Sequence, residues 1–468
     1  MVEIIDTEIA IIGGGPAGYV AAIRAAQLGA RVLLIEKAEI GGTCLNRGCI
    51  PTKSLVESAR RFLALKEAKK FGLEVENVGF NFLKIQRRKN QIVKRLVKGI
   101  EFLLENNQIQ VLKGEGSFID SHTLSVKGDV EYTVNAKKII IATGSKALSV
   151  PIPGIDGTNV LTSKEILELG DIPTSLIIIG GGVIGDEFAS IFNALGSKVT
   201  IIEMLPHLIP MEDTELGEEL ELAFKRTGIT CNVGSRVTRI SDSPSGEKVV
   251  TFTNTDGEEQ FVEAELVLVS IGRASELEGL NLEVLEELDF RRGITVNSRM
   301  ETNVPDIYAI GDVTQGVPSP MLAYTASHEG EVAVENALGG NVEMDYFGIP
   351  STIFTFPEVA SVGLTEEIAK DQSSEISIGK FPFQGNGRAL IEGESRGFVK
   401  VILNRTTEQI LGVHIIGPHA TELIAEGALA VKNRMTAKEL IEVEHGHPVL
   451  YEAIKEAVLD ALGRAIHK

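Results

Sequence analysis

The feature that most constrains the fold of this chain is a motif that occurs twice. Each copy has an aliphatic run, three glycines in a G-x-G-x-x-G pattern, a helical stretch, a second aliphatic run and a terminal acid. The second copy follows the first at a constant offset of 167 residues. The glycines and terminal acids are Gly13, Gly15, Gly18 and Glu36 in the first copy, and Gly180, Gly182, Gly185 and Glu203 in the second.

This pattern is typical of a strand, a tight turn and a helix that together bind a dinucleotide. The first glycine permits the turn, the second lets the backbone approach the pyrophosphate, and the third lets helix and strand pack closely. The pyrophosphate lies at the positively polarised helix N-terminus, and the terminal acid accepts hydrogen bonds from the adenosine ribose. One copy alone indicates little, but two copies in the same context predict an α/β chain that binds two different dinucleotides.

The acid that ends the second copy bears on the choice of nicotinamide cofactor. A 2′-phosphate would be repelled by the carboxylate of Glu203 and needs a basic partner nearby. The residues that follow, Met204–His207, contain no Arg or Lys. The sequence therefore predicts NAD rather than NADP at this site.

Length, charge and cysteine count narrow the class of protein further. The 468 residues are enough for about two to four domains. The net charge is −20 and no basic block offsets it, which argues against nucleic-acid binding. No signal peptide or run of 18 apolar residues is present, so we expect a cytoplasmic protein without a membrane span. Three cysteines suit neither a disulfide scaffold nor a four-ligand zinc site, so no metal site is predicted.

Two of the cysteines, Cys44 and Cys49, are five residues apart in a polar, glycine-rich segment. On a regular helix their Cα atoms would be about 8–9 Å apart, whereas a disulfide needs less than about 7 Å. We therefore expect a bend, which Gly48 can supply. Pro51 suits the first turn of a helix predicted over residues 52–68. Cys49 would then lie just before the helix N-terminus, where the helix dipole stabilises a thiolate.

An alternative for this pair is two unrelated buried thiols, because cysteine is often simply buried. A polar, glycine-rich loop is a poor place for inert core thiols, so we favour a redox-active pair. The third cysteine, Cys231, lies in the strand-like stretch 228–233 and is interpreted as an ordinary core residue.

Residues 41–53 read GGTCLNRGCIPTK, which resembles the redox motif of the pyridine nucleotide–disulfide oxidoreductases. The resemblance extends over essentially the whole chain. It implies an α/β fold with two Rossmann-like dinucleotide-binding domains, for FAD and NAD, and an α+β C-terminal dimerisation domain. The implied boundaries are 1–148 for the first part of the FAD-binding domain, 149–273 for the NAD-binding domain, 274–345 for the second part of the FAD-binding or central domain, and 346–468 for the interface domain.

The resemblance also implies where the two cofactors bind. Residues 139–144 (IIIATG) and 309–312 (AIGD) resemble FAD motifs, and the aspartate of the second bonds the ribityl chain. Val183 corresponds to the residue over the flavin face where nicotinamide docks. The implied FAD-binding residues are Gly13, Gly15, Gly18, Glu36, Thr43, Lys53, Thr143, Gly144 and Asp312, and the implied NAD-binding residues are Gly180, Gly182, Val183, Gly185, Glu203 and Gly272.

Roles for the cysteine pair follow from the same resemblance. It implies that Cys44 and Cys49 form a disulfide against the flavin. Cys44 exchanges thiols with the substrate, and Cys49 faces the flavin ring. Lys53 of the redox motif pairs with Glu187, which follows the second glycine motif by two residues.

The C-terminal segment 444–452 reads EHGHPVLYE and resembles the acid–base element of the family. The resemblance implies that His447 takes the substrate proton, with Glu452 orienting its ring, across a homodimer interface. Pro448 suits the start of a helix that is predicted to run to residue 466. His447 would then lie just outside the helix, and Glu452 about one turn into it. The role of His445 is left open.

Residues 346–366, 381–388, 397–403 and 410–418 resemble the dihydrolipoamide dehydrogenase branch of the family, and their alternating apolar residues predict strands. This branch oxidises protein-bound dihydrolipoyl groups to lipoyl disulfide, with electrons passing through the cysteine pair and FAD to NAD+. We expect no lipoyl-type domain ahead of the first strand. We therefore expect the lipoyl group on another protein, either the acyltransferase core of a 2-oxo acid dehydrogenase complex or a glycine-cleavage carrier.

Some positions depart from the family pattern. Tyr324 stands where relatives usually have His, Asp186 is an extra acid, residues 274–276 replace a more basic stretch, and Val449 replaces Thr.

Other activities of the family fit this sequence less well. A glutathione-type reductase would use NADP, and a mercuric reductase would carry a second cysteine pair near the C-terminus. A catalytically silent assembly subunit is the alternative of a different class, and the intact cysteine pair argues against it.

Overall fold

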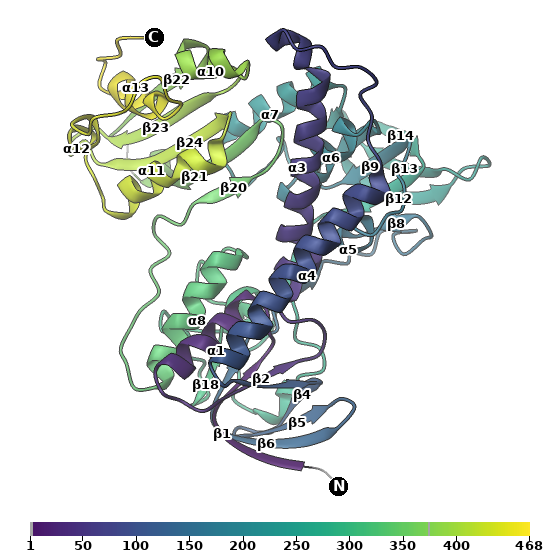
Figure 1. The fold of residues 1–468 in the computed structure, drawn as a ribbon, viewed down its shortest axis with the longest axis vertical. Coiled ribbons are helices and arrows are strands. Elements are labelled where there is room, and N and C mark those ends of the chain that lie inside the picture. The colour runs from purple at the N-terminus through teal and green to yellow at the C-terminus, as the bar shows by residue number, and fades with distance from the viewer. Residues whose placement is uncertain (1–2, 373–374) are drawn as a thin grey trace. The chain divides into compact units, whose positions relative to one another are not determined.

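The computed structural model describes residues 3–372 and 375–468 of the chain. These residues form two compact units, both drawn in Figure 1. Unit 1 contains the chain up to Ser54 together with Lys84–Leu148 and Gly272–Tyr346. Unit 2 contains Leu55–Leu83, Ser149–Ile271 and the chain from Phe347 onward. The finer division at residues 148, 273 and 345 stays a prediction.

The sheet of unit 1 is built around the first copy of the glycine motif. Strand β1 (Glu3–Ile12) pairs in parallel with β2 (Val32–Glu36) and with β6 (Glu131–Ile141). The run Ile9–Ile12 is buried, because a parallel strand covered on both faces is aliphatic along its whole length. The other strands of this sheet are β3 (Gln110–Lys113), β4 (Glu115–Asp120), β5 (Thr123–Lys127) and β18 (Ile307–Ala309).

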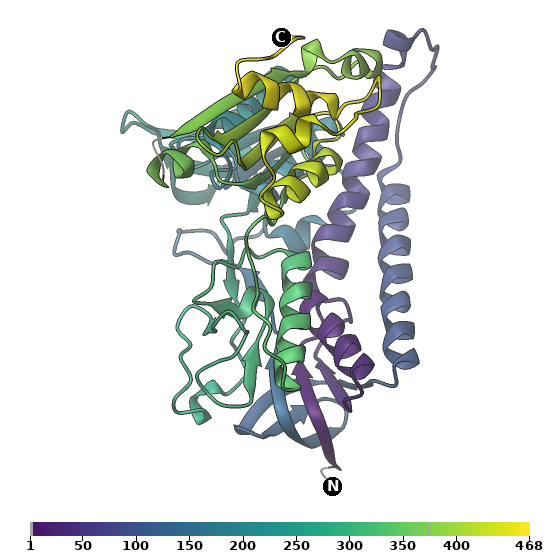
Figure 2. The ribbon, with the colours of Figure 1, turned by 90° about the vertical axis from the view of Figure 1, so that its left-hand side faces the viewer.

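Two helices of unit 1, α1 (Pro16–Gln27) and α8 (Ala323–Ala337), lie side by side in both views (Figures 1 and 2). Small residues allow this approach: a Cβ at Gly330 would lie 2.7 Å from the carbonyl oxygen of Ala17. Unit 1 also contains the shorter elements α2 (Gly42–Arg47), β7 (Ser145–Ala147), β16 (Arg273–Ser275), η2 (Leu282–Val284), β17 (Ile294–Thr295), η3 (Gly311–Val313) and β19 (Thr314–Gln315).

The unit boundaries near residues 54 and 83 fall within helices. Helix α3 (Cys49–Lys66) begins in unit 1 and continues into unit 2, where η1 (Ala68–Phe71) follows. Helix α4 (Phe82–Asn106) then leads back into unit 1. No helix of residues 3–372 or 375–468 combines the length and apolar composition needed to cross a bilayer.

The second copy of the motif forms a parallel sheet in unit 2. Strand β9 (Ser175–Ile179) lies between β10 (Lys198–Ile202) and β15 (Leu266–Val269), and α6 (Val183–Ala194) follows it. The two aliphatic runs of the second motif copy are therefore strands, as the motif predicted. The neighbouring elements are β8 (Val160–Leu161), α5 (Ser163–Ile166), α7 (Thr214–Thr227), β11 (Thr230–Asn232) and the antiparallel strands β12 (Arg236–Asp242), β13 (Lys248–Thr253) and β14 (Glu259–Ala264).

The C-terminal part of unit 2 is an antiparallel sheet with helices packed on one face, drawn in green and yellow in Figure 2. Its core includes Val401, Val413, Ile454 and Val458, none of them exposed. The elements are β20 (Ser351–Ile353), β21 (Glu358–Gly363), α9 (Glu366–Gln372), β22 (Ile376–Pro382), η4 (Phe383–Gly385), α10 (Gly387–Glu392), β23 (Phe398–Asn404), β24 (Ile410–Gly417), α11 (Ala420–Lys432), α12 (Ala437–Ile441) and α13 (Glu452–Ala461).

Most strands predicted for this part are confirmed, and one is wrong. The segments 346–366, 397–403 and 410–418 contain β20, β21, β23 and β24. The segment 381–388 holds only the end of β22. It continues as a helical turn and then α10, because the side chain of Asn386 caps α10 by accepting the amide hydrogen of Ala389 at 3.0 Å.

Candidate active site and nucleotide-binding sites

The first glycine motif forms a tight turn between β1 and α1. Gly13 has φ +108°, and a Cβ there would lie 2.3 Å from the carbonyl oxygen of Ala142. A Cβ at Gly18 would lie 1.8 Å from the carbonyl oxygen of Gly13. Gly15 is the N-cap of α1 and offers no side-chain acceptor, so the amides of the first turn suit an anion. The turn therefore fits the pyrophosphate of a dinucleotide.

Glu36, at the end of β2, closes this turn from the side. Its Oε2 atom accepts the amide hydrogen of Gly14 and its Oε1 atom that of Ala38, both at 2.6 Å. A carboxylate has about four acceptor positions, so Glu36 can also accept hydrogen bonds from ribose hydroxyls. Gly13, Glu36, Gly116 and Thr143 line an adjacent cavity, where we expect the adenosine end of FAD.

The second FAD motif ends in Asp312, within the short turn η3. The Asp312 carboxylate accepts the hydroxyl hydrogen of Ser145 at 2.5 Å, and Arg273 Nε lies 3.9 Å from it. Arg273 also donates to the hydroxyl of Ser145 at 2.7 Å and to its carbonyl oxygen at 2.6 Å. The sequence did not single out Ser145, although it directly follows the 139–144 motif. Its position directly after this motif is the sequence signal that could have revealed Ser145.

Three other predicted cofactor residues belong to the same part of unit 1. Thr143 donates its hydroxyl to the carbonyl oxygen of Glu276 at 2.7 Å, and the Glu276 amide donates to Gly144 at 2.8 Å. Gly272 has φ +123°, and its carbonyl oxygen accepts the Leu148 amide at 3.0 Å. Gly272 thus lies in unit 1, whereas the other residues predicted to bind NAD lie in unit 2.

Glu329 is a buried residue next to the predicted FAD site that the sequence did not reveal. It lies on α8, is not exposed, and accepts the amide hydrogen of Gly311 at 2.6 Å. Its other oxygen accepts the hydroxyls of Ser319 at 2.6 Å and Tyr346 at 2.7 Å. Gly311 begins the turn that holds Asp312, so Glu329 fixes the predicted ribityl-binding turn from behind.

The structure brings the thiols of Cys44 and Cys49 into contact. Gly48 between them has φ −144° and ψ −112°, so the predicted bend at Gly48 is confirmed. A hydrogen bond between the two thiols, burial and the charge of Cys49 raise the pKa of Cys44, while the ammonium of Lys53 acts in the opposite direction. The two sulfurs are therefore placed for exchange between dithiol and disulfide.

The local structure around this pair differs from the prediction. The sequence predicts a loop followed by a helix over 52–68, whereas Cys44 lies in the helical turn α2 and Cys49 is the first residue of α3. The side chain of Asn46 closes the α2 turn by donating to the carbonyl oxygens of Ile40 and Gly42, both at 3.0 Å. Pro51 does lie in the first turn of α3, where its missing N–H needs no partner.

Two cations of unit 1 act on the cysteine pair. Lys53 lies one turn further along α3, and its charge favours a thiolate at Cys44. The pKa of Arg273 is lowered, because burial outweighs the opposing effect of the negative charges of Asp312 and Cys49. Thr43 is exposed on α2, and its contact with FAD stays a prediction.

The second glycine motif repeats the geometry of the first. Gly180 has φ +104°, and a Cβ at Gly185 would lie 2.2 Å from its carbonyl oxygen. Gly182 is the N-cap of α6 and offers no side-chain acceptor. Glu203 accepts the amide hydrogens of Gly181 at 2.6 Å and Leu205 at 2.7 Å. Val183, the first residue of α6, is 38% exposed, and its position over a flavin stays a prediction.

Helix α6 also carries two neighbouring acids. Glu187 accepts the amide hydrogen of Phe354 at 3.0 Å within unit 2, and its pairing with Lys53 of unit 1 stays a prediction. Asp186 is not exposed, and within residues 3–372 and 375–468 neither carboxyl oxygen has a hydrogen-bond partner. Burial, followed by the charges of Glu203 and Glu187, raises the pKa of Asp186 well above its usual value.

Cys231 is half-buried on β11. Burial, together with the nearby charges of Asp186 and Glu221, raises the pKa of Cys231 to about 12. A thiol with so high a pKa is a poor nucleophile at neutral pH.

His447 and Glu452 form a hydrogen-bonded pair, with 2.9 Å between Nδ1 and Oε1. Burial tends to raise the pKa of Glu452, but the amide of Val449 and the ring of His447 outweigh it and lower that pKa. An ionised Glu452 can only accept, so Nδ1 of His447 carries the proton and Nε2 is left to act as a base. The His447 side chain is 78% exposed.

The helix expected to start at Pro448 begins instead at Glu452, so that prediction is wrong. Val449, Leu450 and Tyr451 separate Pro448 from α13, and the other Glu452 oxygen accepts the Val449 amide at 2.9 Å. Glu452 is therefore the first helical residue rather than one turn in. The helix ends at Ala461, short of the predicted residue 466.

His445, left open by the sequence, is held by two contacts. Its Nε2 atom lies 2.8 Å from Glu426, and its Nδ1 atom lies 2.8 Å from the carbonyl oxygen of Val443. The side chain is only 5% exposed. These contacts hold His445 in a fixed position beside the segment that carries His447.

Comparison with known proteins identifies the class. The family model described as pyridine nucleotide-disulphide oxidoreductase matches residues 7–330, and that of the family's dimerisation domain matches residues 349–458. The chain therefore belongs to the pyridine nucleotide–disulphide oxidoreductase family, and the predicted α/β fold with a dimerisation domain is confirmed. The dimerisation domain supports a homodimer.

Individual relatives within the family indicate a narrower group than the family models do. A dihydrolipoyl dehydrogenase of Bacillus subtilis is 43% identical over 473 residues, covering 99% of both chains. The mitochondrial dihydrolipoyl dehydrogenase of Pisum sativum is 40% identical, covering 99% of this chain and 93% of its own. Among solved structures, LpdA of Mycobacterium tuberculosis has a TM-score of 0.87 at 31% identity, covering 97% of this chain and 99% of its own. The HOCl-induced flavoprotein disulfide reductase RclA of Escherichia coli has a TM-score of 0.86 at 29% identity, with the same coverage.

Proposed function

We propose that this chain oxidises protein-bound dihydrolipoyl groups to the lipoyl disulfide, with NAD+ as the final electron acceptor. The observation that carries this proposal is the contact between the thiols of Cys44 and Cys49, in the same unit as a glycine turn that fits FAD. Relatives named dihydrolipoyl dehydrogenase, similar over almost the whole chain, support the choice of substrate.

FAD and NAD are the cofactors, and two sets of residues fit them. The first glycine turn, Glu36 and Asp312 suit FAD, and the second turn with Glu203 suits NAD. Bound FAD and NAD supply the two-electron chemistry that returns the reduced cysteine pair to its disulfide. The residues of this chain hold both cofactors and carry out the thiol exchange.

The exchange begins with the cysteine pair as a disulfide. A substrate thiolate attacks Sγ of Cys44, forming a mixed disulfide and breaking the bond to Cys49, which leaves as a thiolate. The second substrate thiol then loses its proton and attacks the substrate sulfur of the mixed disulfide. This step releases the lipoyl disulfide and a reduced Cys44. Two electrons thereby pass from the substrate dithiol to the cysteine pair, and Lys53 and Arg273 stabilise the thiolates.

His447 is proposed as the base that removes the substrate protons. Nε2 of the ring is available because Nδ1 donates to the ionised Glu452. In the homodimer, the His447–Glu452 pair of one subunit serves the disulfide of the other. General-base catalysis of this kind typically contributes about 10²–10⁴-fold in rate.

The carrier of the lipoyl group is proposed to be a second protein. Its class is a lipoyl domain, belonging either to the acyltransferase core of a 2-oxo acid dehydrogenase complex or to a glycine-cleavage carrier.

Steady-state assays of the purified holoenzyme test this function. We expect turnover of dihydrolipoamide with NAD+, at a kcat/KM at least about a hundredfold above that with NADP+, because Glu203 repels a 2′-phosphate. Glutathione disulfide with NADPH serves as the competing pair of substrates. Faster turnover of that pair would contradict both the substrate and the cofactor assignment.

A further inference from the structure

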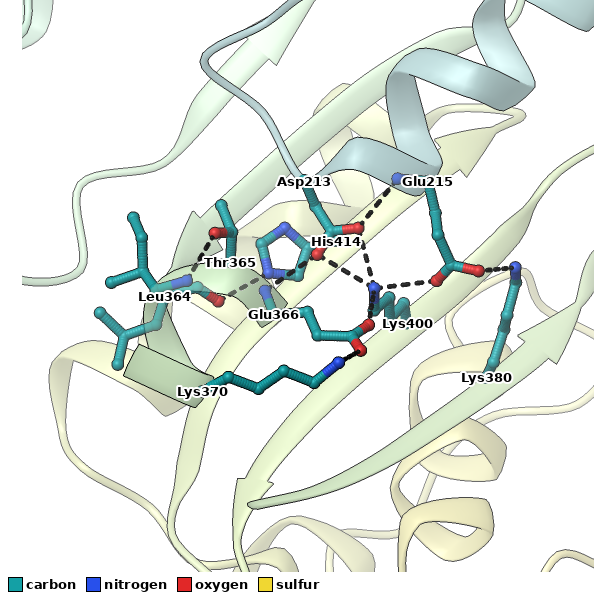
Figure 3. A network of polar contacts seen from close by, with 10 residues as sticks. Asp213, Glu215, Leu364, Thr365, Glu366, Lys370, Lys380, Lys400 and His414 are labelled. Carbon is teal, nitrogen blue, oxygen red and sulfur yellow. Dashed lines mark hydrogen bonds and ion pairs between the residues drawn. The ribbon is translucent and has the colours of Figure 1, made fainter. Parts of the chain in front are cut away.

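A buried lysine lies at the centre of a network of charges in unit 2 (Figure 3). Lys400, on β23, has no exposed side-chain surface. Its Nζ atom lies 2.9 Å from Asp213, 2.8 Å from Glu215 and 2.5 Å from Glu366. Burial tends to lower the pKa of Lys400, but the three carboxylates outweigh burial and raise it, so the lysine remains charged.

The network joins two parts of unit 2 that are distant in sequence. Asp213 is the N-cap of α7, following the nucleotide-binding strand β10, whereas Lys400 and Glu366 belong to the dimerisation domain. The carboxylate of Asp213 accepts the amide hydrogens of Glu215 at 3.2 Å and Glu366 at 3.0 Å. The Asp213 carboxylate therefore caps α7 and also accepts the amide hydrogen of the first residue of α9.

The preceding residue, Glu212, strengthens this connection. One oxygen of Glu212 accepts the hydroxyl of Ser351 at 2.6 Å, and the other accepts the hydroxyl of Ser361. Both serines lie on strands of the dimerisation domain. The end of the segment 204–213 is thus held by the dimerisation domain through Glu212 as well as Asp213.

The middle of the segment 204–213 contacts the second glycine motif through Ile209. The amide of Glu212 donates to the carbonyl oxygen of Ile209 at 2.9 Å, and the amide of Ile209 donates to Gly181 at 2.7 Å. Gly181 in turn donates its amide hydrogen to the carboxylate of Glu203 at 2.6 Å. Adjacent contacts therefore lead from Lys400 through Asp213 and the segment 204–213 to Glu203.

We infer that Lys400 is a positioning residue for NAD, which it does not touch. It holds the segment 204–213 against the dimerisation domain, and this segment keeps Gly181 and the carboxylate of Glu203 in place for the adenosine ribose. The inference rests on the proposed assignment of Glu203 to that ribose. Its consequence is that the dimerisation domain sets the affinity of the nucleotide-binding sheet for NAD.

A merely structural Lys400 predicts a different result. It would lower the stability of the whole protein without changing NAD affinity in molecules that fold. A positioning residue changes NAD affinity and leaves the reaction of the dithiol with the cysteine pair unaltered. The two roles are therefore separated by measuring NAD binding and the dithiol half-reaction on the same sample.

The test compares Lys400→Met with Lys370→Met in the FAD-loaded holoenzyme. Lys370 contacts the same Glu366 at 2.5 Å but is 60% exposed, so it is a matched control at the rim of the network. For Lys400→Met we expect the Kd for NAD+, measured by calorimetry, to rise about 5- to 20-fold, the range for changes along a coupling network. FAD content and the anaerobic rate of reduction by dihydrolipoamide should match the wild type, and Lys370→Met should bind NAD+ normally.

Lys400→Met removes the buried cation from Asp213 and leaves Glu215 and Glu366 each with one lysine that is more exposed, Lys380 and Lys370 respectively. The variant can fail to fold, so two further variants decide the question. Lys400→Met with Asp213→Asn also removes the charge of Asp213, and Glu212→Gln leaves Lys400 and its carboxylates intact. Weaker NAD+ binding in the folded variants supports the inference, and a Kd within twofold of the wild type overturns it. Glu203→Ala separates the two assignments, because normal NAD+ binding in that variant would refute the ribose assignment itself.

Discussion

The Nδ1 atom of His447 lies 2.9 Å from the Oε1 atom of Glu452, and the rest of the imidazole ring is largely exposed. This arrangement fixes the proton on the inner nitrogen and presents the outer nitrogen to an incoming thiol. The neighbouring His445 differs, because both of its nitrogens are engaged and its side chain is buried. The two histidines of one short segment therefore have different expected roles.

Replacing the proposed base should slow only the dithiol half-reaction. For His447→Gln we expect reduction of the holoenzyme by dihydrolipoamide to fall about 10²–10⁴-fold, the usual range for loss of a general base. Stopped-flow absorbance under anaerobic conditions measures this rate. His445→Gln is the matched control and should stay within a few-fold of the wild type. A normal rate for His447→Gln would remove it from this role.

Removing the exchange thiol should separate cofactor binding from turnover. Cys44→Ser deletes the sulfur that the substrate attacks but leaves the glycine turn, Glu36 and Asp312 unchanged. We expect a yellow protein with full FAD content and no measurable oxidation of dihydrolipoamide. Flavin absorbance and a steady-state assay are the measurements. Retained dihydrolipoamide turnover would contradict the disulfide mechanism.

Asp186 should make stability fall as the pH rises. Its pKa is raised in the folded state, so above about pH 4 the unfolded chain loses this proton while the folded chain keeps it. The contribution to stability is therefore fully present below about pH 4 and is lost by up to about 1.4 kcal/mol per pH unit until the folded-state pKa is reached.

Asp186→Val removes this titration together with a buried carboxyl group that lacks a hydrogen-bond partner in the described part of the chain. We expect its Tm to exceed that of the wild type by more at pH 8 than at pH 5. Thermal unfolding monitored by circular dichroism across this range measures the difference. Asp171→Asn, at an exposed position, should give a curve parallel to the wild type. A constant Tm difference at all pH values would contradict the assignment.

Glu329 should affect FAD retention, because it accepts the amide hydrogen of Gly311 next to Asp312. For Glu329→Ala we expect flavin to be released faster on dialysis, by about one order of magnitude, since a lost buried charge-assisted hydrogen bond typically costs about 1.5–3 kcal/mol. Glu335→Ala on the same helix, where Glu335 forms a partly exposed pair with Arg24, is the control. Equal flavin release from both variants would exclude this role.

The repeated glycine motif was predictable because its constraints are local. A tight turn and a close helix–strand approach require glycine wherever they occur, so Gly13 and Gly180 share positive φ values. The acids that end β2 and β10 also share their contacts, each accepting an amide from the glycine turn. Short-range geometry therefore allowed both nucleotide sites to be predicted from spacing alone.

The helix boundaries around the reactive groups were harder to predict. Proline at position 51 or 448 is compatible with the first turn of a helix, but it does not determine where the helix begins. Cys49 starts α3 ahead of Pro51, whereas α13 starts well after Pro448. In the second case the Glu452 side chain accepts the Val449 amide and marks the helix start.

The buried network around Lys400 could not be predicted, because its members come from distant segments. Lys400 is the one charged residue in the strand sequence FVKVILN, and lysine is rarely fully buried, so the sequence favours a solvent-facing side chain. Its partner Asp213 is 187 residues away in sequence. Only the packing of β23 against the N-terminus of α7 reveals that both charges are buried together.

The most direct test of the disulfide mechanism is the anaerobic absorbance spectrum of the holoenzyme after addition of dihydrolipoamide. We expect a long-wavelength band from the thiolate of Cys49 against the flavin, which disappears when NAD+ is added. The Cys44→Ser variant should not form this band in response to dihydrolipoamide. A wild-type spectrum that stays unchanged with dihydrolipoamide, while the bound flavin is still reduced by NADH, would contradict the claim that dithiol electrons pass through Cys44 and Cys49.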